Sequence, residues 1–215
     1  MIARTRDAPD RAIAAAVRGR RFFASLAVVI WGLGALACTG RAGASADRTL
    51  VACDFSSSAE GWLIVADTGD APPDFHSSGG HPGGFISGND EAVGETWYFR
   101  APANVLAKLP SAENAVLRYS LEQSETDAGF PDDDVVIVGR AGRLSYRFNY
   151  APGTNWTEFS VQLSEAAGWR WNRNRPATQQ QITSVLADPV RLEIRGEYRT
   201  GPDVGGLDSV VLTGR

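Results

Sequence analysis

The chain has 215 residues, of which 43% are hydrophobic and 9% aromatic, and it carries 21 basic and 25 acidic side chains. This is the composition of a globular protein, and it excludes a mostly disordered or collagen-like chain. Only two Cys (Cys38 and Cys53) and two His (His76 and His81) are present. They are too few for a disulfide-rich scaffold or a zinc-finger type of site.

The N-terminal segment has the pattern of a secretory signal. A basic patch at Arg18–Arg21 precedes a run without charged residues from 22 to 37. That run fits the hydrophobic region of a signal peptide and is short for a membrane span. We therefore expect a signal peptide over 1–37, a linker over 38–49 and one folded domain over 50–215.

Two cleavage sites compete in this segment. Ala35-Leu-Ala-Cys38 resembles a bacterial lipobox, which would make Cys38 a lipidated N-terminus, although Ala35 replaces the usual Leu. Ala44-Ser-Ala46 fits ordinary signal peptidase but lies farther from the hydrophobic run. We favour the lipoprotein, so the sequence predicts an exported protein, either an outer-membrane or cell-surface lipoprotein or a secreted one.

The domain that follows is acidic. Residues 1–46 hold seven Arg and two Asp, which leaves 14 basic and 23 acidic groups, a net charge of −9. Nucleic acids and anionic membranes require a basic face, so we expect neither as a partner, except for a membrane reached through a lipid on Cys38. Cys53 lies in an apolar run and is expected to be a buried small hydrophobic residue.

Most of the domain alternates apolar and polar residues with a period of two, which is typical of strands with one buried face. Other short runs are more continuously apolar and indicate strands buried on both faces or at a sheet centre. In chain order, the expected strands lie near 50–55, 62–66, 84–87, 95–100, 117–121, 134–138, 144–150, 159–163, 190–194 and 207–212.

One segment has helical spacing instead. Thr178 and Gln181 have the spacing of a capping box, apolar residues follow at helical intervals, and Asp188-Pro189 ends the pattern. The sequence thus predicts an all-β protein, an antiparallel β-sandwich or jelly roll with one short helix near 178–187.

An ordered set of short motifs resembles the laminin B domain, also called laminin IV type A. The motifs are Asp54-Phe55 with Glu60-Gly-Trp62, Gly79–Phe85, Trp97–Pro102, Leu117–Leu121, Asp134–Gly139 with Leu144-Ser-Tyr146, Trp156-Thr157 with Val161, Gly168-Trp169, Val185-Leu186, Leu192–Tyr198 and Leu207–Val210. The resemblance implies a sandwich similar to galactose-binding and carbohydrate-binding modules, in an extracellular, non-catalytic domain. Because the chain lacks the Cys-rich modules that flank such domains in animals, only the fold and a generic adhesive or binding role carry over.

The residues give little support for catalysis. His76 and His81 are expected in a Gly/Pro-rich loop, and neither is part of a nucleophile motif. A carboxylate pair for glycoside hydrolysis would have to come from residues that we expect mostly on solvated strand faces: Glu95, Glu122, Glu158 and Glu193.

A structural calcium ion is a further hypothesis, since Ca²⁺ prefers carboxylate and carbonyl oxygens. Asp54 is expected in the first strand, Asp208 opens the last, and Asp90 is expected in a loop, Ser87-Gly-Asn-Asp90, that could add carbonyl oxygens. These three aspartates could converge on one ion, or Asp208 could cap a turn and Asp90 be solvated. The acidic run 132–134 is expected to be a solvated loop, with calcium binding as the lesser alternative.

A ligand site is suggested by the segment from Trp169 to Arg175, which mixes Trp, Arg and Asn. Sugars pack their C–H faces on exposed aromatic rings beside polar groups. Candidate binding residues are therefore Trp169, Trp171, Arg173 and Arg175. The alternative is that Trp169 is a core residue and that the Arg side chains stack on it or pair with acids.

We thus expect an exported, non-enzymatic binding or adhesion domain that recognises a glycan or a cell-envelope partner through its loops. Two alternatives remain open. One is a hydrolase acting on polysaccharide through a carboxylate pair, and the other is a purely structural envelope lipoprotein.

Overall fold

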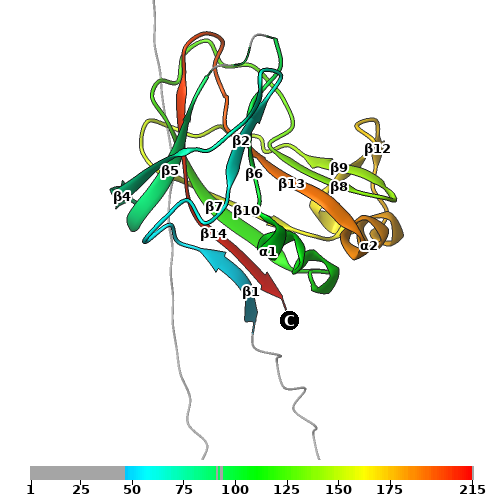
Figure 1. Ribbon diagram of the computed structural model, residues 1–215. Helices are drawn as coiled ribbons and strands as arrows, with labels where there is room; N and C mark the ends of the chain where they lie inside the picture. The colour runs from blue at the N-terminus through cyan, green and yellow to red at the C-terminus, as the bar shows by residue number, and fades with distance from the viewer. Residues whose placement is uncertain (1–46, 91, 93, 215) are drawn as a thin grey trace, which may run out of the picture. The chain divides into compact units, whose positions relative to one another are not determined.

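The computed structural model describes residues 47–214, apart from 91 and 93 (Figure 1). The predicted signal peptide, Cys38 and the alternative cleavage site at Ala46 lie outside the described residues. Within them, no helix is both long enough and apolar enough to cross a membrane.

The strands form two antiparallel sheets that pack as a β-sandwich, as predicted (Figure 1). The first sheet has the order β10-β7-β14-β5-β4, with β1 also paired to β14. Its strands are β1 (Arg48–Cys53), β4 (Asp74–Gly80), β5 (Gly83–Asn89), β7 (Val116–Gln123), β10 (Thr157–Gln162) and β14 (Val204–Gly214). The long strand β14 pairs with β5 through its first half and with β1 through its second half.

The second sheet has the order β12-β11-β9-β8-β13-β6-β2-β3. Its strands are β2 (Leu63–Ala66), β3 (Gly69–Ala71), β6 (Tyr98–Arg100), β8 (Val135–Gly139), β9 (Gly142–Tyr146), β11 (Arg170–Trp171), β12 (Arg175–Pro176) and β13 (Pro189–Arg195). The short strands β3, β11 and β12 were not expected from the sequence, and the strand expected over 144–150 ends at Tyr146.

The period-two pattern has its predicted structural meaning. In β7 the apolar residues Leu117, Tyr119 and Leu121 are buried between the sheets, while Arg118 is exposed. The same alternation in β10 buries Phe159 and Val161. Burying these side chains removes apolar surface from water on both inner faces, which is what holds the sheets together.

A tryptophan joins the two layers. Trp97, just before β6, is fully buried, and its indole lies against the backbone of Gly88, Gly196 and Gly205. A Cβ built on Gly196 would lie 1.8 Å from the Trp97 ring. These glycines are therefore needed for close packing, since any side chain there would occupy the space of the indole.

Helical segments connect the strands at one end of the sandwich: α1 (Ala103–Leu106), α2 (Gln179–Ala187) and the 3₁₀ turns η1 (Leu109–Ser111) and η2 (Glu165–Ala167). Helix α2 confirms the predicted helix. Thr178 and Gln181 form both hydrogen bonds of the capping box, and the apolar face of α2 is buried.

Cys53 also lies where the sequence places it. Its side chain is buried in the core, and burial raises the pKa of the thiol to about 12. It is therefore a packing residue rather than a nucleophile, because the thiolate is the reactive form.

Candidate functional site

The outer face of the second sheet carries a row of charged side chains. Directly paired residues of neighbouring strands share a face. Glu193 of β13 pairs with Arg100 of β6 and Val136 of β8, Val136 pairs with Ser145 of β9, and Ser145 pairs with Arg170 of β11. Arg170, Glu193 and Arg100 thus lie on the side of the sheet that faces away from the core.

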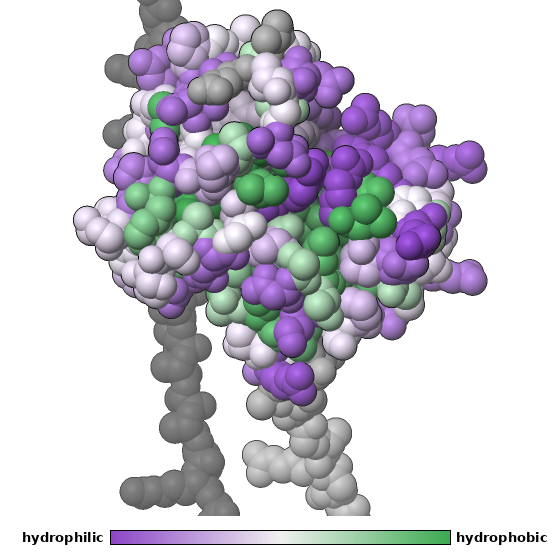
Figure 2. All heavy atoms as spheres, in the orientation of Figure 1, coloured by the Kyte–Doolittle hydropathy of each residue, from purple (hydrophilic) through white to green (hydrophobic). Residues whose placement is uncertain are grey.

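Two adjoining hollows lie along this face. One has a volume of about 500 Å³ and is lined, among others, by Tyr98, Arg100, Asp132, Arg143, Arg173 and Glu193. The other, of about 490 Å³, is lined by Asp132, Asp133, Arg147, Gly168, Arg170 and Arg173. Because both include Asp132 and Arg173, they form one groove, here called the arginine groove. Figure 2 shows hydrophilic side chains gathered at the end of the molecule where β8, β9 and β12 lie.

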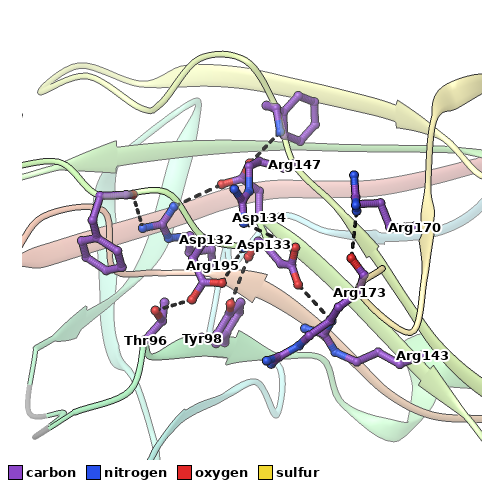
Figure 3. A network of polar contacts seen from close by, with 12 residues as sticks. Thr96, Tyr98, Asp132, Asp133, Asp134, Arg143, Arg147, Arg170, Arg173 and Arg195 are labelled. Atoms are coloured by element: carbon purple, nitrogen blue, oxygen red, sulfur yellow. Dashed lines mark hydrogen bonds and ion pairs between the residues drawn. The ribbon is translucent and has the colours of Figure 1, made fainter. Parts of the chain in front are cut away.

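Three consecutive aspartates form the centre of this site (Figure 3). Asp132 accepts hydrogen bonds from the Thr96 hydroxyl (2.5 Å) and from the backbone N–H of Asp133. Burial opposes the ionisation of Asp132, but these hydrogen bonds, together with the positive charges of Arg195 and Arg147, outweigh it and hold its pKa below the ordinary value. Asp133 pairs with Arg143 at 2.9 Å and with Arg147 at 3.8 Å.

The third aspartate belongs to a buried cluster around Arg195. Asp134 accepts a hydrogen bond from the backbone N–H of Phe148, and its other carboxylate oxygen lies 3.6 Å from the Arg195 guanidinium. Arg195 donates to the carbonyls of Phe130 and Glu197 and lies between the rings of Phe130 and Tyr198. Burial raises the pKa of Asp134. The prediction of a solvated loop at 132–134 is therefore wrong, since Asp133 and Asp134 are buried and ion-paired.

At the other end of the groove, two arginines face solvent. Arg170 and Arg173 are exposed, and neither forms an ion pair with an acid in the described part of the chain. The Nε–H of Arg170 donates to the carbonyl of Arg173 at 2.9 Å, which orients the Arg170 side chain (Figure 3).

The four predicted ligand residues are not brought together. Trp169 is fully buried and donates its indole N–H to the carbonyl of Gln162, so it is a core residue and not a sugar platform. Trp171 is half-buried over Gly142, and its partner Leu144 lies in the core, so Trp171 faces inward. Arg175 of β12 pairs directly with Trp171 of β11, so the two side chains lie on the same, inward side of the β11–β12 hairpin. Only Arg173 lines the groove.

The three predicted calcium ligands are also separate. The Asp54 carboxylate is exposed and accepts from the N–H of Ser56, while that of Asp90 accepts from the N–H of Ala92. Asp208 is fully buried and accepts from the backbone N–H groups of His81 and Ser209. Among the described residues, no three His, Cys, Asp or Glu side chains are grouped so as to hold a metal ion. The structure therefore does not support their convergence on one ion; Asp208 fixes a turn instead.

The carboxylates proposed for the hydrolase alternative are distributed over both sheets. Glu193 pairs with Arg100 at 3.0 Å and lies 3.8 Å from Arg191, which leaves its carboxylate occupied. Glu95 and Glu193 both line the hollow of about 500 Å³ in the arginine groove. Glu122 and Glu158 belong instead to β7 and β10 of the first sheet.

The histidines lie near that other sheet's outer face. His76 is part of strand β4 rather than of a loop, where it stacks on Phe85 at 4.3 Å and contacts the Ser87 hydroxyl at 2.8 Å. Phe85 in turn contacts the Trp156 ring edge-on. His76, Phe85 and Glu122 line a separate hollow of about 370 Å³.

Most of the groove could not be found from the sequence because its residues come from distant segments. Arg147 occupies a polar position of an expected strand, which reads individually as solvated. Two signals were available: the Trp169–Arg175 segment, and the run of three aspartates beside a strand, because acids that become buried require basic partners elsewhere.

Comparisons with known proteins agree with this architecture. The model of the family Laminin B (Domain IV) matches residues 98–214, a range that holds most of the arginine groove. No curated protein matches the chain significantly.

Solved structures show the same fold at low identity. The L4b domain of human laminin alpha-2 has 13% identity and a TM-score of 0.60, with 77% of this chain and 97% of that chain covered. CtCBM11, studied in solution for its structure, dynamics and binding, has 12% identity and a TM-score of 0.50, over 80% and 98% of the two chains. The family 11 carbohydrate-binding module of the cellulosomal cellulase Lic26A-Cel5E of Clostridium thermocellum has 10% identity and a TM-score of 0.44, over 79% and 95%. The chain belongs to the Laminin B (Domain IV) family.

Proposed function

We propose that this protein is an exported, non-catalytic binding domain that recognises a glycan through the arginine groove. The observation that carries the proposal is the groove itself, two joined hollows of about 500 and 490 Å³ on the outer face of one sheet. Its lining of guanidinium and carboxylate groups offers donors and acceptors for sugar hydroxyls.

The fold supports a binding role of this kind. The chain shares its sandwich with a laminin domain and with CtCBM11, a carbohydrate-binding-module fold. Four carboxylates line the groove, one of which belongs to Glu95. Of the other three, those of Asp133 and Glu193 are paired with arginines, and that of Asp132 accepts a hydrogen bond from the Thr96 hydroxyl. A glycosidase requires one carboxyl free to donate a proton and a second free to attack or to activate water. Groove carboxylates fixed by arginines suit recognition better than acid catalysis.

Rigidity of the site also favours binding. The acidic segment 132–134 is held by Arg195, Thr96 and Arg143 rather than by solvent. A groove whose side chains are already fixed loses less conformational entropy when a ligand binds.

A glycan array on the purified protein tests the proposal. We expect binding to at least one polysaccharide class, and we expect an Arg143→Gln, Arg100→Gln double variant to weaken it. The matched control is Trp156→Ala on the opposite sheet, which should leave binding unchanged. Absence of binding to any glycan would contradict the proposal and favour the structural envelope protein, while release of reducing ends would favour the hydrolase.

Export and lipidation are a separate part of the proposal. The sequence supports cleavage before Cys38 with acylation of that residue, or cleavage after Ala46. The intact mass of the protein recovered from the cell envelope distinguishes them, because a diacylated Cys38 adds lipid mass that a Cys38→Ser variant would lack.

A further inference from the structure

We propose that the end of the arginine groove formed by Arg147, Arg170 and Arg173 binds an anionic group of the ligand, so that the glycan is acidic. This inference rests on the proposed function and specifies its ligand class. The second hollow places these three guanidinium side chains around a space of about 490 Å³ that also borders Asp132 and Asp133.

The charges in this hollow are not balanced. Its lining carries three guanidinium groups against two carboxylates, and one of these, Asp133, is also paired with Arg143 at 2.9 Å outside the hollow's lining. Neither Arg170 nor Arg173 forms an ion pair with an acid among the described residues. The domain over residues 47–215 has a net charge of −9. Two arginines without acidic partners beside an open hollow are therefore unusual in this domain, and a bound anion would balance their positive charge.

The arginines are also oriented for this role. The Nε–H of Arg170 is used by the Arg173 carbonyl, which leaves its two terminal nitrogens for a ligand. These nitrogens can donate two parallel hydrogen bonds to a carboxylate or sulfate, and a side chain already fixed loses less entropy in doing so.

The backbone at Arg173 gives independent support. Asn172 and Arg173 have φ values of 46° and 69°, and they form the turn between β11 and β12. Two successive residues at positive φ are typical of a type I′ turn, in which Asn is favoured first and Gly second. An arginine at the second position is sterically unfavourable relative to glycine. Residues in such strained backbone regions cluster at ligand sites, which fits a binding role for the Arg173 side chain.

Single-stranded nucleic acid fits the site less well. Such ligands require aromatic rings on which successive bases stack, and the hollow lined by Arg147, Arg170 and Arg173 contains no aromatic side chain. The anionic group is therefore assigned to an acidic sugar, carrying either a carboxylate or a sulfate.

Matched pairs of polysaccharides test the inference by titration calorimetry. Polygalacturonate is compared with its methyl ester, which removes the carboxylate charge, and dextran sulfate with dextran. We expect one acidic polymer to bind at least about tenfold more tightly than its neutral counterpart. The polymer that shows this preference identifies the anion as carboxylate or sulfate.

Two variants test whether the preference for the acidic polymer depends on these arginines. The Arg170→Gln, Arg173→Gln double variant is expected to lose the preference. The Arg175→Gln variant, the matched control, removes a charge from the other side of the same hairpin and is expected to keep the preference. Because the substituted arginines are exposed, we expect both variants to have the melting temperature of the unsubstituted protein, which will show that they are folded. Equal binding of acidic and neutral forms, or a preference that survives the double variant, would overturn the inference while leaving glycan binding in place. Failure to bind any glycan on the array would instead overturn the proposed function.

Discussion

Removing the Arg195 side chain, which lies in the buried cluster beside the arginine groove, should destabilise the protein more than removing an arginine that lines the groove. Arg195→Ala leaves Asp134 charged and buried, with both partners of this pair 3% exposed, and it removes the donors to the carbonyls of Phe130 and Glu197. It also removes the cation that lies 4.5 Å and 4.3 Å from the ring centroids of Phe130 and Tyr198.

The expected loss follows from the buried pair. Deleting one partner of such a pair costs about 3–5 kcal/mol, because an uncompensated charge remains in the interior. The stacking and carbonyl contacts belong to the same cluster and do not simply add to this figure. Against a typical domain stability of about 5–15 kcal/mol, a loss of this size leaves a marginal protein.

Urea unfolding followed by tryptophan fluorescence measures the change. Arg191→Ala is the matched control, because Arg191 lies on the same strand with its side chain 44% exposed and 3.8 Å from Glu193; we expect it to cost at most about 0.5 kcal/mol. Adding Asp134→Asn to the Arg195→Ala variant should recover part of the loss, since it removes the stranded charge. A loss below about 1 kcal/mol for Arg195→Ala would refute the reasoning.

Four further outcomes are expected. Arg173→Gly should raise the free energy of unfolding by about 0.5–1 kcal/mol, because glycine adopts φ 69° without strain. The same substitution should weaken binding of the acidic glycan. A variant less stable than the unsubstituted protein would contradict the assignment of the turn. Gly196→Ala should lower the melting temperature strongly, since its Cβ would overlap the Trp97 ring, and a melting temperature like that of the unsubstituted protein would show that the indole can move aside. The melting temperature should rise as the pH falls from neutral toward the ordinary pKa range of Asp and Glu. Burial raises the pKa of five carboxyl groups, so the folded state retains their protons more strongly and gains stability until the unfolded chain is protonated as well. The carboxyl groups with a raised pKa are Glu122, Asp134, Glu197, Asp203 and Asp208. They outnumber the two groups whose pKa is lowered, Asp54 and Asp132. A fall in melting temperature over this pH range would show that other groups dominate. Adding Ca²⁺ to EDTA-treated protein should leave the melting temperature unchanged, and a clear rise would indicate a metal site formed in some other way.

The fold could be predicted because its determinants are local. Alternation in Leu117–Leu121 and in Phe159–Leu163 specifies which face of each strand is buried, and the Thr178–Gln181 spacing specifies where α2 begins. The two-residue strands β11 and β12 escaped prediction because their length gives no measurable period.

The site could not be predicted to the same extent, because its chemistry depends on contacts between distant segments. Asp132–Asp134 reads as a solvated run until Arg195, on another strand, is placed against Asp134. The prediction for Trp169 and Trp171 erred in the opposite direction, because residues expected to face a ligand face the core. The two side chains point to the same side of the sheet, as their spacing implies, but the composition of the segment does not reveal that this side is the buried one.

Binding on the outer face of the second sheet, in the arginine groove, can be tested by mapping NMR chemical-shift changes on addition of the best-bound glycan. We expect the largest changes at the backbone and guanidinium N–H groups of Arg143, Arg147, Arg170 and Arg173. Changes centred instead on the indole N–H of Trp156 and the ring of His76 would place the binding surface on the opposite sheet and refute binding in the groove.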